Sequence, residues 1–128
     1  MDQQELFDRF VDSTLPGDEF HHQQHVQVAW LFVQKHGMPG ALGEFSDAIK
    51  RFADAKGKAG LYHETITWAF LLLISERQAR NPAGTWQEFE AANTDLLIWK
   101  PSILERYYSK ELLASDLARR TFLMPDLL

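Results

Sequence analysis

Hydrophobic residues recur every three or four positions along most of the chain, which is the spacing of one face of an α-helix. The pattern predicts a first helix over residues 3–11, where the apolar side chains share one face. A second helix is expected from about Glu19 to Lys35, because Asp18 can serve as its N-cap and Gly37 follows its last turn. The first third of the chain is therefore predicted to be helical.

The next segments continue this pattern. A third helix is expected to begin at Pro39 or Gly40 and to end in the glycine- and lysine-rich residues 56–60. A fourth is expected from about residue 61 or 62 to Arg80, and it is apolar almost all round between residues 66 and 74. A helix that is apolar on all sides belongs at the centre of a bundle.

The C-terminal third is less regular. Thr85 and Glu88 have the spacing of a capping box, which predicts the start of a fifth helix. Residues 96–99 read as a hydrophobic helix end, and short helices are expected over about residues 102–107 and 110–119. No alternating strand pattern persists. Residues 1–128 are therefore predicted to form a single-domain, all-α bundle of about five main helices with short helical segments at the C-terminus.

Composition narrows the possible functions. The 128 residues include 45% hydrophobic residues and four tryptophans, which is typical of a folded core. A net charge of −5 gives no basic face for nucleic acid, and the absence of cysteine excludes disulfides and thiolate metal sites. The longest apolar run, residues 68–74, is too short to span a membrane, so a cytoplasmic protein is expected. With 12% aromatic residues, the surface has room for a homodimer contact.

Four of the five histidines lie in two short stretches, residues 20–25 and 62–65. His22 and His25 are three positions apart and share a helix face that continues in apolar residues. His21 would take the place of His22 if the helix were rotated. His63 leads into a second apolar stripe, with Glu64 beside it. Both stretches are expected in the first turn of a helix.

These stretches predict a metal site. If the second, third and fourth helices run up, down and up, His22, His25, His63 and Glu64 lie at the same end of the bundle. Three imidazole nitrogens and one carboxylate suit zinc, iron, nickel or manganese, with room for water. The alternative is ordinary helix capping, since a first-turn glutamate already favours the helix dipole. Residues 63–67 do not form the HExxH motif of zinc proteases.

Other polar residues are candidates for binding a ligand. Tyr62 and Thr67 flank the second histidine stretch and can hydrogen-bond a small molecule, whereas Thr65 is expected to help the helix start. The pair Tyr107–Tyr108 reads as a helix junction in which one ring is buried and Ser109 caps the next helix.

Five motifs together resemble a family of small uncharacterised bacterial helical proteins. They are FxHxxH (residues 20–25), YHET (residues 62–65), YYS (residues 107–109), AR (residues 118–119) and PD (residues 125–126). The resemblance covers residues 20–126 and implies a helical fold, but it adds no substrate. It favours His22 over His21 as the inward residue, and it adds Tyr108, Ser109 and Arg119 to the candidates for ligand binding.

Two classes of function follow. In the first, the protein is a metal-dependent enzyme acting on a small molecule: His22, His25 and His63 hold the ion, and Glu64 is a fourth ligand or, with His63, the acid–base group. In the second, it is a non-catalytic module that binds an apolar small ligand or a partner in a helical pocket, with the histidines as caps or hydrogen-bond donors. A regulator that senses metal or pH would lie between them. Motifs for nucleotide binding and for serine hydrolysis are absent.

Overall fold

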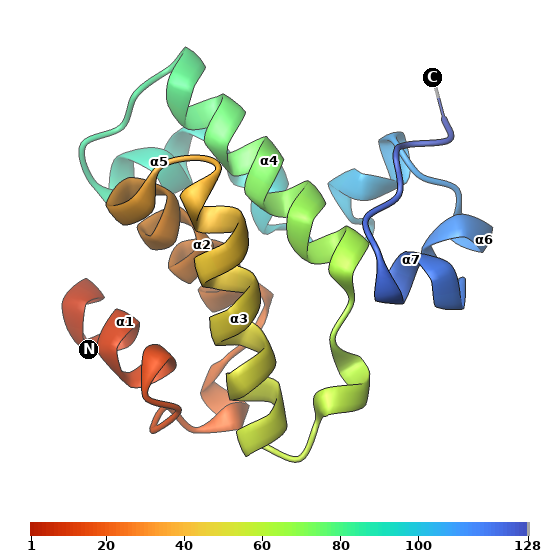
Figure 1. The fold of residues 1–128 in the computed structure, drawn as a ribbon. Coiled ribbons are helices and arrows are strands. Elements are labelled where there is room, and N and C mark those ends of the chain that lie inside the picture. Colours follow the sequence, from red (N-terminus) through yellow and green to blue (C-terminus); the bar gives the residue numbers. More distant parts are fainter. Residues whose placement is uncertain (128) are drawn as a thin grey trace. The chain divides into compact units, whose positions relative to one another are not determined.

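The computed structural model describes residues 1–127, and this part of the chain holds seven α-helices and four short 3-10 helices (Figure 1). No β-strand occurs among these residues, in which an isolated bridge joins Trp99 and Ser102. The predicted all-α fold class is confirmed. The chain divides into two compact units, Met1–Tyr62 and His63–Leu128. The expectation of one domain over the whole chain stays a prediction.

The N-terminal unit is built from three α-helices. These are α1 (Gln3–Val11), α2 (His22–His36) and α3 (Gly40–Ala55), with the 3-10 turns η1 (Gly17–Glu19) and η2 (Ala59–Leu61). The three helices pack against one another, α2 and α3 most extensively. Helices α1 and α3 keep the predicted boundaries. The hydrophobic spacing was therefore sufficient to locate them.

A cluster of phenylalanine rings forms the core of this unit. Phe10 is fully buried within it. The centroid of its ring lies 5.1 Å from the centroids of Phe20 and Phe52 and 5.9 Å from that of Phe45. Aromatic pairs at such distances contribute roughly 0.5–1.5 kcal/mol each beyond the burial of their surface. Phe32 of α2 joins the cluster, with its ring centroid 6.2 Å from that of Phe10 and 5.3 Å from that of Phe45, so the cluster connects all three helices.

Helix α2 begins later than predicted. The predicted N-cap, Asp18, lies inside η1, and the helix begins at His22 with His21 in the N-cap position. The prediction was wrong here because Phe20 packs into the phenylalanine cluster, and the chain leaves helical geometry to bring its ring there. The end of the helix agrees with the prediction. Gly37 follows it with φ of 66°, a conformation that favours glycine.

The C-terminal unit begins with α4 (Glu64–Arg80), which has 17 residues and starts later than predicted because His63 is its N-cap. Its apolar stretch is buried at Leu71 and Ile74, but Leu72 keeps 42% of its surface exposed. The expectation of burial on all sides is therefore wrong at Leu72. Within residues 1–127, every helix falls short of what a bilayer-spanning segment needs. The expected cytoplasmic location stays a prediction.

Helix α5 (Trp86–Ala92) starts at the predicted capping box, in which the Thr85 hydroxyl accepts a hydrogen bond from the Glu88 backbone N–H at 3.2 Å. The segment after α5 is tied back to α4 by an ion pair. The Arg77 guanidinium donates two hydrogen bonds to the Asp95 carboxylate, at 3.0 and 2.9 Å. This pair positions the irregular part of the unit on α4.

Short helices make up the rest of the unit. They are η3 (Thr94–Leu97), η4 (Ile103–Arg106), α6 (Lys110–Leu113) and α7 (Asp116–Arg120). The predicted helix over residues 110–119 is two helices, because the Ser115 hydroxyl accepts from the Ala118 N–H and caps a new start. Helix α7 packs against α4. We call residues 121–127, which follow α7, the C-terminal tail.

Candidate functional site

The predicted metal ligands are divided between the two units. His22 and His25 lie in the first turns of α2, and His63 and Glu64 lie at the start of α4. Within residues 1–127, no three His, Asp or Glu side chains are grouped so that they could hold a metal ion. The pocket shared by the four residues, and a zinc, iron, nickel or manganese ion in it, stay predictions.

His25 is the most unusual of the five histidines. Its ring packs against Phe20 and Phe45, with centroid distances of 5.8 and 5.4 Å, and lies 6.4 Å from the nearly parallel ring of His22. The residue as a whole is half-buried, yet its Nδ1 atom is inaccessible to solvent and has no hydrogen-bond partner among the described atoms. Burial, and to a smaller extent the neighbouring His22, lower the pKa of His25 to about 4. His25 is therefore neutral near pH 7, the form that binds a metal.

His21 is exposed, and its backbone N–H donates to Gln24 Oε1 at 3.0 Å.

His63 forms hydrogen bonds through both ring nitrogens. Its Nδ1 accepts from the Ile66 backbone N–H at 3.1 Å, and its Nε2 lies 2.7 Å from the carbonyl oxygen of Leu113. These contacts require the tautomer that carries the proton on Nε2. The side chain thus caps α4 and ties it to the end of α6, and it is only 8% exposed. A metal ion could bind His63 only if one of these hydrogen bonds were broken.

Thr65, in the first turn of α4, fixes the start of the C-terminal tail. Its fully buried hydroxyl donates to the carbonyl oxygen of Thr121 at 2.8 Å and accepts from the N–H of Leu123 at 3.1 Å. The sequence suggested that this threonine helps the helix to start. The structure instead shows a hydroxyl that uses both its donor and its acceptor on the backbone of the tail.

The junction between η4 and α6 fixes the rest of the tail. The Tyr108 hydroxyl donates to the carbonyl oxygen of Leu123 at 2.8 Å. The N–H and the hydroxyl of Ser109 donate to the two carboxylate oxygens of Asp126, at 2.8 and 2.6 Å, and these bonds lower the pKa of Asp126. The N–H of Leu127 donates to the carbonyl oxygen of Tyr107 at 3.0 Å.

The predictions that Ser109 caps a helix and that one tyrosine ring is buried are confirmed, with Tyr108 buried and Tyr107 exposed.

Motif residues are thus hydrogen-bonded to the same segment. Thr65 of YHET and Tyr108 of YYS both bond to the backbone of Leu123, and Ser109 of YYS bonds to Asp126 of PD. Among the described residues, six hydrogen bonds join the tail to Thr65 and to residues 107–109. The side chains of the tail are nevertheless partly or largely exposed, with Met124 at 76%. The tail is therefore fixed by polar contacts, together with the stacking of the Phe122 ring on that of Trp68, whose centroids lie 5.6 Å apart.

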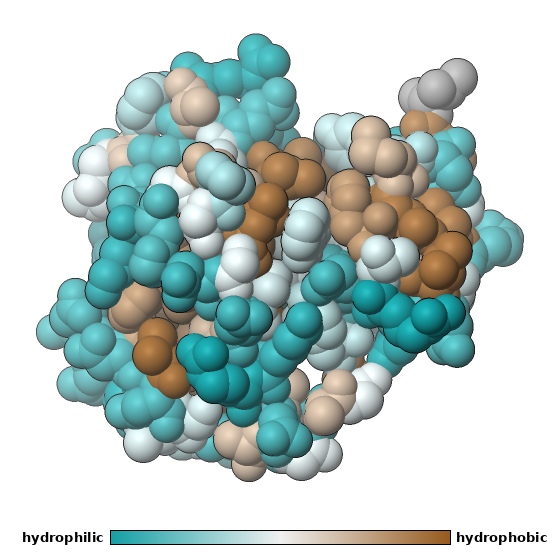
Figure 2. All heavy atoms as spheres, in the orientation of Figure 1, coloured by the Kyte–Doolittle hydropathy of each residue, from teal (hydrophilic) through white to brown (hydrophobic). Residues whose placement is uncertain are grey.

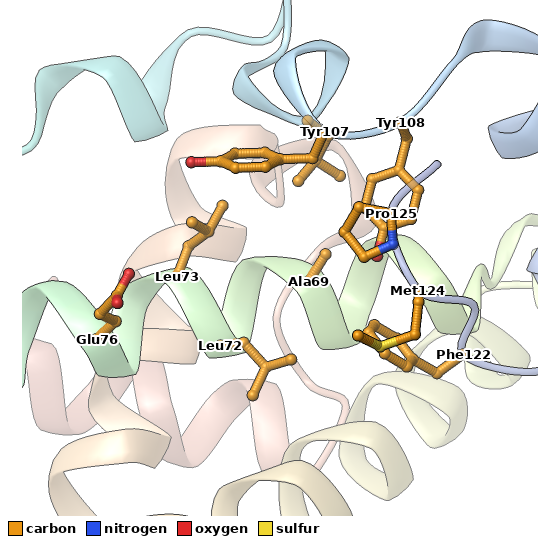
Figure 3. Close-up of a pocket in the computed structure, with 10 residues that line it drawn as sticks. Ala69, Leu72, Leu73, Glu76, Tyr107, Tyr108, Phe122, Met124 and Pro125 are labelled. Atoms are coloured by element: carbon orange, nitrogen blue, oxygen red, sulfur yellow. The ribbon is translucent and has the colours of Figure 1, made fainter. Parts of the chain in front are cut away.

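The tail forms one wall of a pocket on α4 (Figure 3). The pocket has a volume of about 360 Å³ and lies within the C-terminal unit. Its lining is almost entirely apolar or aromatic: Ala69, Leu72, Leu73, Glu76, Leu104, Tyr107, Tyr108, Phe122, Met124 and Pro125. Figure 3 shows α4 beneath the pocket, the two tyrosines above it, and the tail residues at one end, with Glu76 at the other. In Figure 2, hydrophobic side chains gather over α4 and over the C-terminal end of the chain.

The remaining candidates are not among the residues that line this pocket. Tyr62 ends η2 in the N-terminal unit, where the Lys50 ammonium lies 5.0 Å from the centroid of its ring. Thr67 is buried in α4, and Arg119 is half-buried in the last turn of α7. Of the predicted ligand-binding residues, only Tyr108 lines the pocket, and Ser109 acts on its wall through Asp126.

The apolar residues that line the pocket are not evident from the sequence as site residues. Leu72 and Leu73 belong to the stretch of α4 that is apolar all round, a pattern that predicts burial rather than a binding site. Phe122 and Met124 lie in a segment that is too short and irregular to show a periodic pattern. The signal in the sequence that could have indicated the pocket is that α4 has more apolar residues than one buried helix face requires.

Comparison of the chain with protein-family models, with curated proteins and with solved structures gave no match. The resemblance to the family of bacterial helical proteins therefore stays a prediction, and the site has to be interpreted from its own geometry.

Proposed function

We propose that the protein is a non-catalytic binding module and that its C-terminal unit holds a small, largely apolar molecule in the pocket between α4 and the C-terminal tail. The volume of about 360 Å³ is within the range of roughly 300–1,000 Å³ that is usual for small-molecule sites. An apolar lining with a few polar groups is also usual for such sites. The predicted homodimer is compatible with this function and stays a prediction.

The observation that carries the proposal is the way in which the tail is fixed. An exposed, irregular segment without such contacts could move freely at little cost. This tail is instead held by six hydrogen bonds, and two of them use the buried hydroxyl of Thr65. The result is a defined position for Phe122, Met124 and Pro125, whose side chains form one end of the pocket. A preformed wall reduces the entropy that a ligand would otherwise lose on ordering it.

The methionines offer a direct test. The chain has three, and of these only Met124 lines the pocket. Protein labelled with ¹³C in the methionine methyl groups should be titrated with 1-octanol, a neutral apolar probe. The Met124 resonance, assigned from a Met124→Leu variant, should shift and saturate while those of Met1 and Met38 stay in place. A titration that moves no methionine signal, or all three in proportion, would remove the basis of the proposal.

A pair of leucine variants provides the control. Leu72 and Leu117 are both exposed, at 42% and 50%, but only Leu72 lines the pocket. Leu72→Gln should weaken octanol binding because it places an amide on the apolar floor, and Leu117→Gln should leave it unchanged. Equal effects of the two changes would show that octanol adsorbs to exposed leucines in general.

The metal-dependent enzyme is a second candidate, and one observation favours it. The Nδ1 atom of His25 is buried and has no hydrogen-bond partner within residues 1–127, and leaving such an atom unsatisfied costs roughly 1–3 kcal/mol. A ligand to this nitrogen would remove that cost, and the neighbouring His22 could supply a second imidazole. The test is elemental analysis of protein that was purified without an affinity tag, before and after chelation. Stoichiometric zinc, iron, nickel or manganese that is lost in His25→Leu would favour this candidate, and its absence would exclude a resident ion.

A further inference from the structure

The one charge in the lining of the pocket is negative. Glu76 is the single Asp, Glu, Lys, Arg or His among the ten described residues that line it. A bound anion would lose its hydration without meeting an opposite charge, whereas a bound cation would meet the Glu76 carboxylate. Charge complementarity therefore favours a cationic ligand.

The Glu76 carboxylate is available for such a ligand. Its partner is Arg80, one turn further along α4, at 3.2 Å, and the two side chains are 56% and 75% exposed. An exposed pair of this kind contributes little, so Glu76 can change its partner at small cost. The other nearby cation, Arg77, is bound by both carboxylate oxygens of Asp95. The charge of Arg77 is therefore already matched.

An aromatic ring adds to the preference for a cation. Tyr107 lines the pocket between the end with Glu76 and the end with Phe122 (Figure 3), and the face of such a ring attracts cations. Burial and the nearby Asp126 raise the pKa of Tyr108, so its hydroxyl stays protonated and continues to donate to Leu123. Asp126 itself is held as a carboxylate by its hydrogen bonds from Ser109, which lower its pKa.

The positions of the lining residues along α4 indicate which end of the ligand carries the charge and how long the ligand is. Glu76 lies at one end of the pocket, and Phe122 and Met124 lie at the other (Figure 3). Ala69 and Glu76 are seven residues apart in the helix, which is about 10 Å at 1.5 Å per residue. A chain of about eight carbon atoms has this length, at roughly 1.2 Å per bond.

Resting on the proposed ligand-binding function, we infer that the ligand is an amphiphilic monocation. It carries an ammonium group, which lies at Glu76, on an aliphatic or aromatic body of about eight carbons, which extends along α4 towards Phe122 and Met124. Glu76 sets the preference for charge, and the apolar lining sets the affinity for the body.

Three probes of equal length test this inference: octylammonium, 1-octanol and octanoate, each titrated below its aggregation concentration and followed by the Met124 methyl signal. We expect octylammonium to bind about fivefold more tightly than 1-octanol, and octanoate more weakly than both. Glu76→Gln should abolish the difference between octylammonium and 1-octanol by weakening the binding of octylammonium. Glu111→Gln, at an exposed glutamate of α6 away from the pocket, is the matched control and should change neither.

The outcomes separate the two proposals. Binding of octanoate as tight as that of octylammonium, or a preference for octylammonium that survives Glu76→Gln, would overturn the inference about charge while the pocket keeps its binding function. Failure of all three probes to move the Met124 signal would overturn the binding function itself. A preference that Glu111→Gln removes as completely as Glu76→Gln would show that the overall charge of the protein, and not Glu76, attracts the cation.

Discussion

The hydroxyl oxygen of Thr65 lies 2.8 Å from the carbonyl oxygen of Thr121, so the first turn of α4 holds the residue at which the C-terminal tail begins. The same hydroxyl accepts from the N–H of Leu123. Thr65 is fully buried, and no solvent can replace either contact. One side chain thereby fixes the direction in which the tail leaves α7.

Thr65→Val tests how much this hydroxyl contributes to the stability of the protein. Valine has nearly the same shape, but it leaves one carbonyl oxygen and one N–H of the tail unpaired, and we expect a loss of about 1–3 kcal/mol in the free energy of unfolding. Urea unfolding measures the change. Thr65→Ser is the control, because it keeps the hydroxyl and loses one methyl group. If the valine variant is as stable as the serine variant, the two hydrogen bonds contribute nothing net.

The regular part of the fold could be predicted from the sequence, because α1 and α3 are amphipathic and their hydrophobic spacing is uninterrupted. Helix boundaries were less predictable where long-range packing decided them. Helix α2 starts later than predicted because Phe20 packs against Phe10, which lies ten residues earlier. The pocket was missed for a related reason: the tail has no period of its own, and its position depends on single hydrogen bonds from Thr65 and Tyr108, about 58 and 15 residues away from Leu123.

The environments of the individual histidines also could not be predicted from their spacing in the sequence. Their concentration near helix starts was visible in the sequence, and it predicted a shared chemical role. The structure gives His63 a capping role with both nitrogens engaged, and it gives His25 a buried nitrogen without a partner. These two environments differ because one ring faces backbone groups and the other faces Phe20 and Phe45. Such a difference depends on tertiary packing, which residue spacing does not encode.

His63→Ala tests the capping role. The change leaves the Ile66 N–H and the Leu113 carbonyl oxygen without their partner, and we expect a loss of roughly 1–3 kcal/mol in stability. Thermal melts of both proteins should be recorded with and without zinc, nickel or manganese. We expect metal to shift neither melt. If metal stabilised the wild type and the alanine variant lost that effect with little loss of stability, His63 would be a metal ligand instead.

Asp126→Ala should release the end of the tail without unfolding the unit. The carboxylate is exposed and binds the N–H and hydroxyl of Ser109, so its removal leaves polar groups that water can solvate. We expect faster hydrogen exchange at the Leu127 N–H, which is bonded to the Tyr107 carbonyl oxygen, and weaker binding of 1-octanol. Exchange should stay slow at the amide of Leu71, which is buried in α4. Unchanged exchange at Leu127 would mean that the other hydrogen bonds suffice to hold the tail.

The pH dependence of stability should depend on His25. Its pKa is about 4 in the folded protein and about 6.5 when unfolded, so between these values the unfolded chain binds more protons than the folded one. The contribution of His25 to stability is therefore fully present above pH 6.5 and is lost as the pH decreases through 6.5 towards 4. The full shift corresponds to a loss of roughly 3 kcal/mol, at 1.36 kcal/mol per pKa unit. Urea unfolding at a series of pH values should show this loss in the wild type.

His25→Leu is the matching variant. Leucine is apolar and cannot take up a proton, and it also removes the unpaired Nδ1 from its contact with Phe20 and Phe45. At pH 7 the variant should be at least as stable as the wild type, because a buried nitrogen without a partner is replaced by an apolar group. Between pH 6.5 and 4 it should lose less stability than the wild type, by roughly the contribution of His25. If the stability of the two proteins fell in parallel with decreasing pH, protonation of His25 would not be the cause of the loss. A variant that is clearly less stable at pH 7 would show that Nδ1 is satisfied in solution by a bound water or ligand, and elemental analysis would then identify a metal ion.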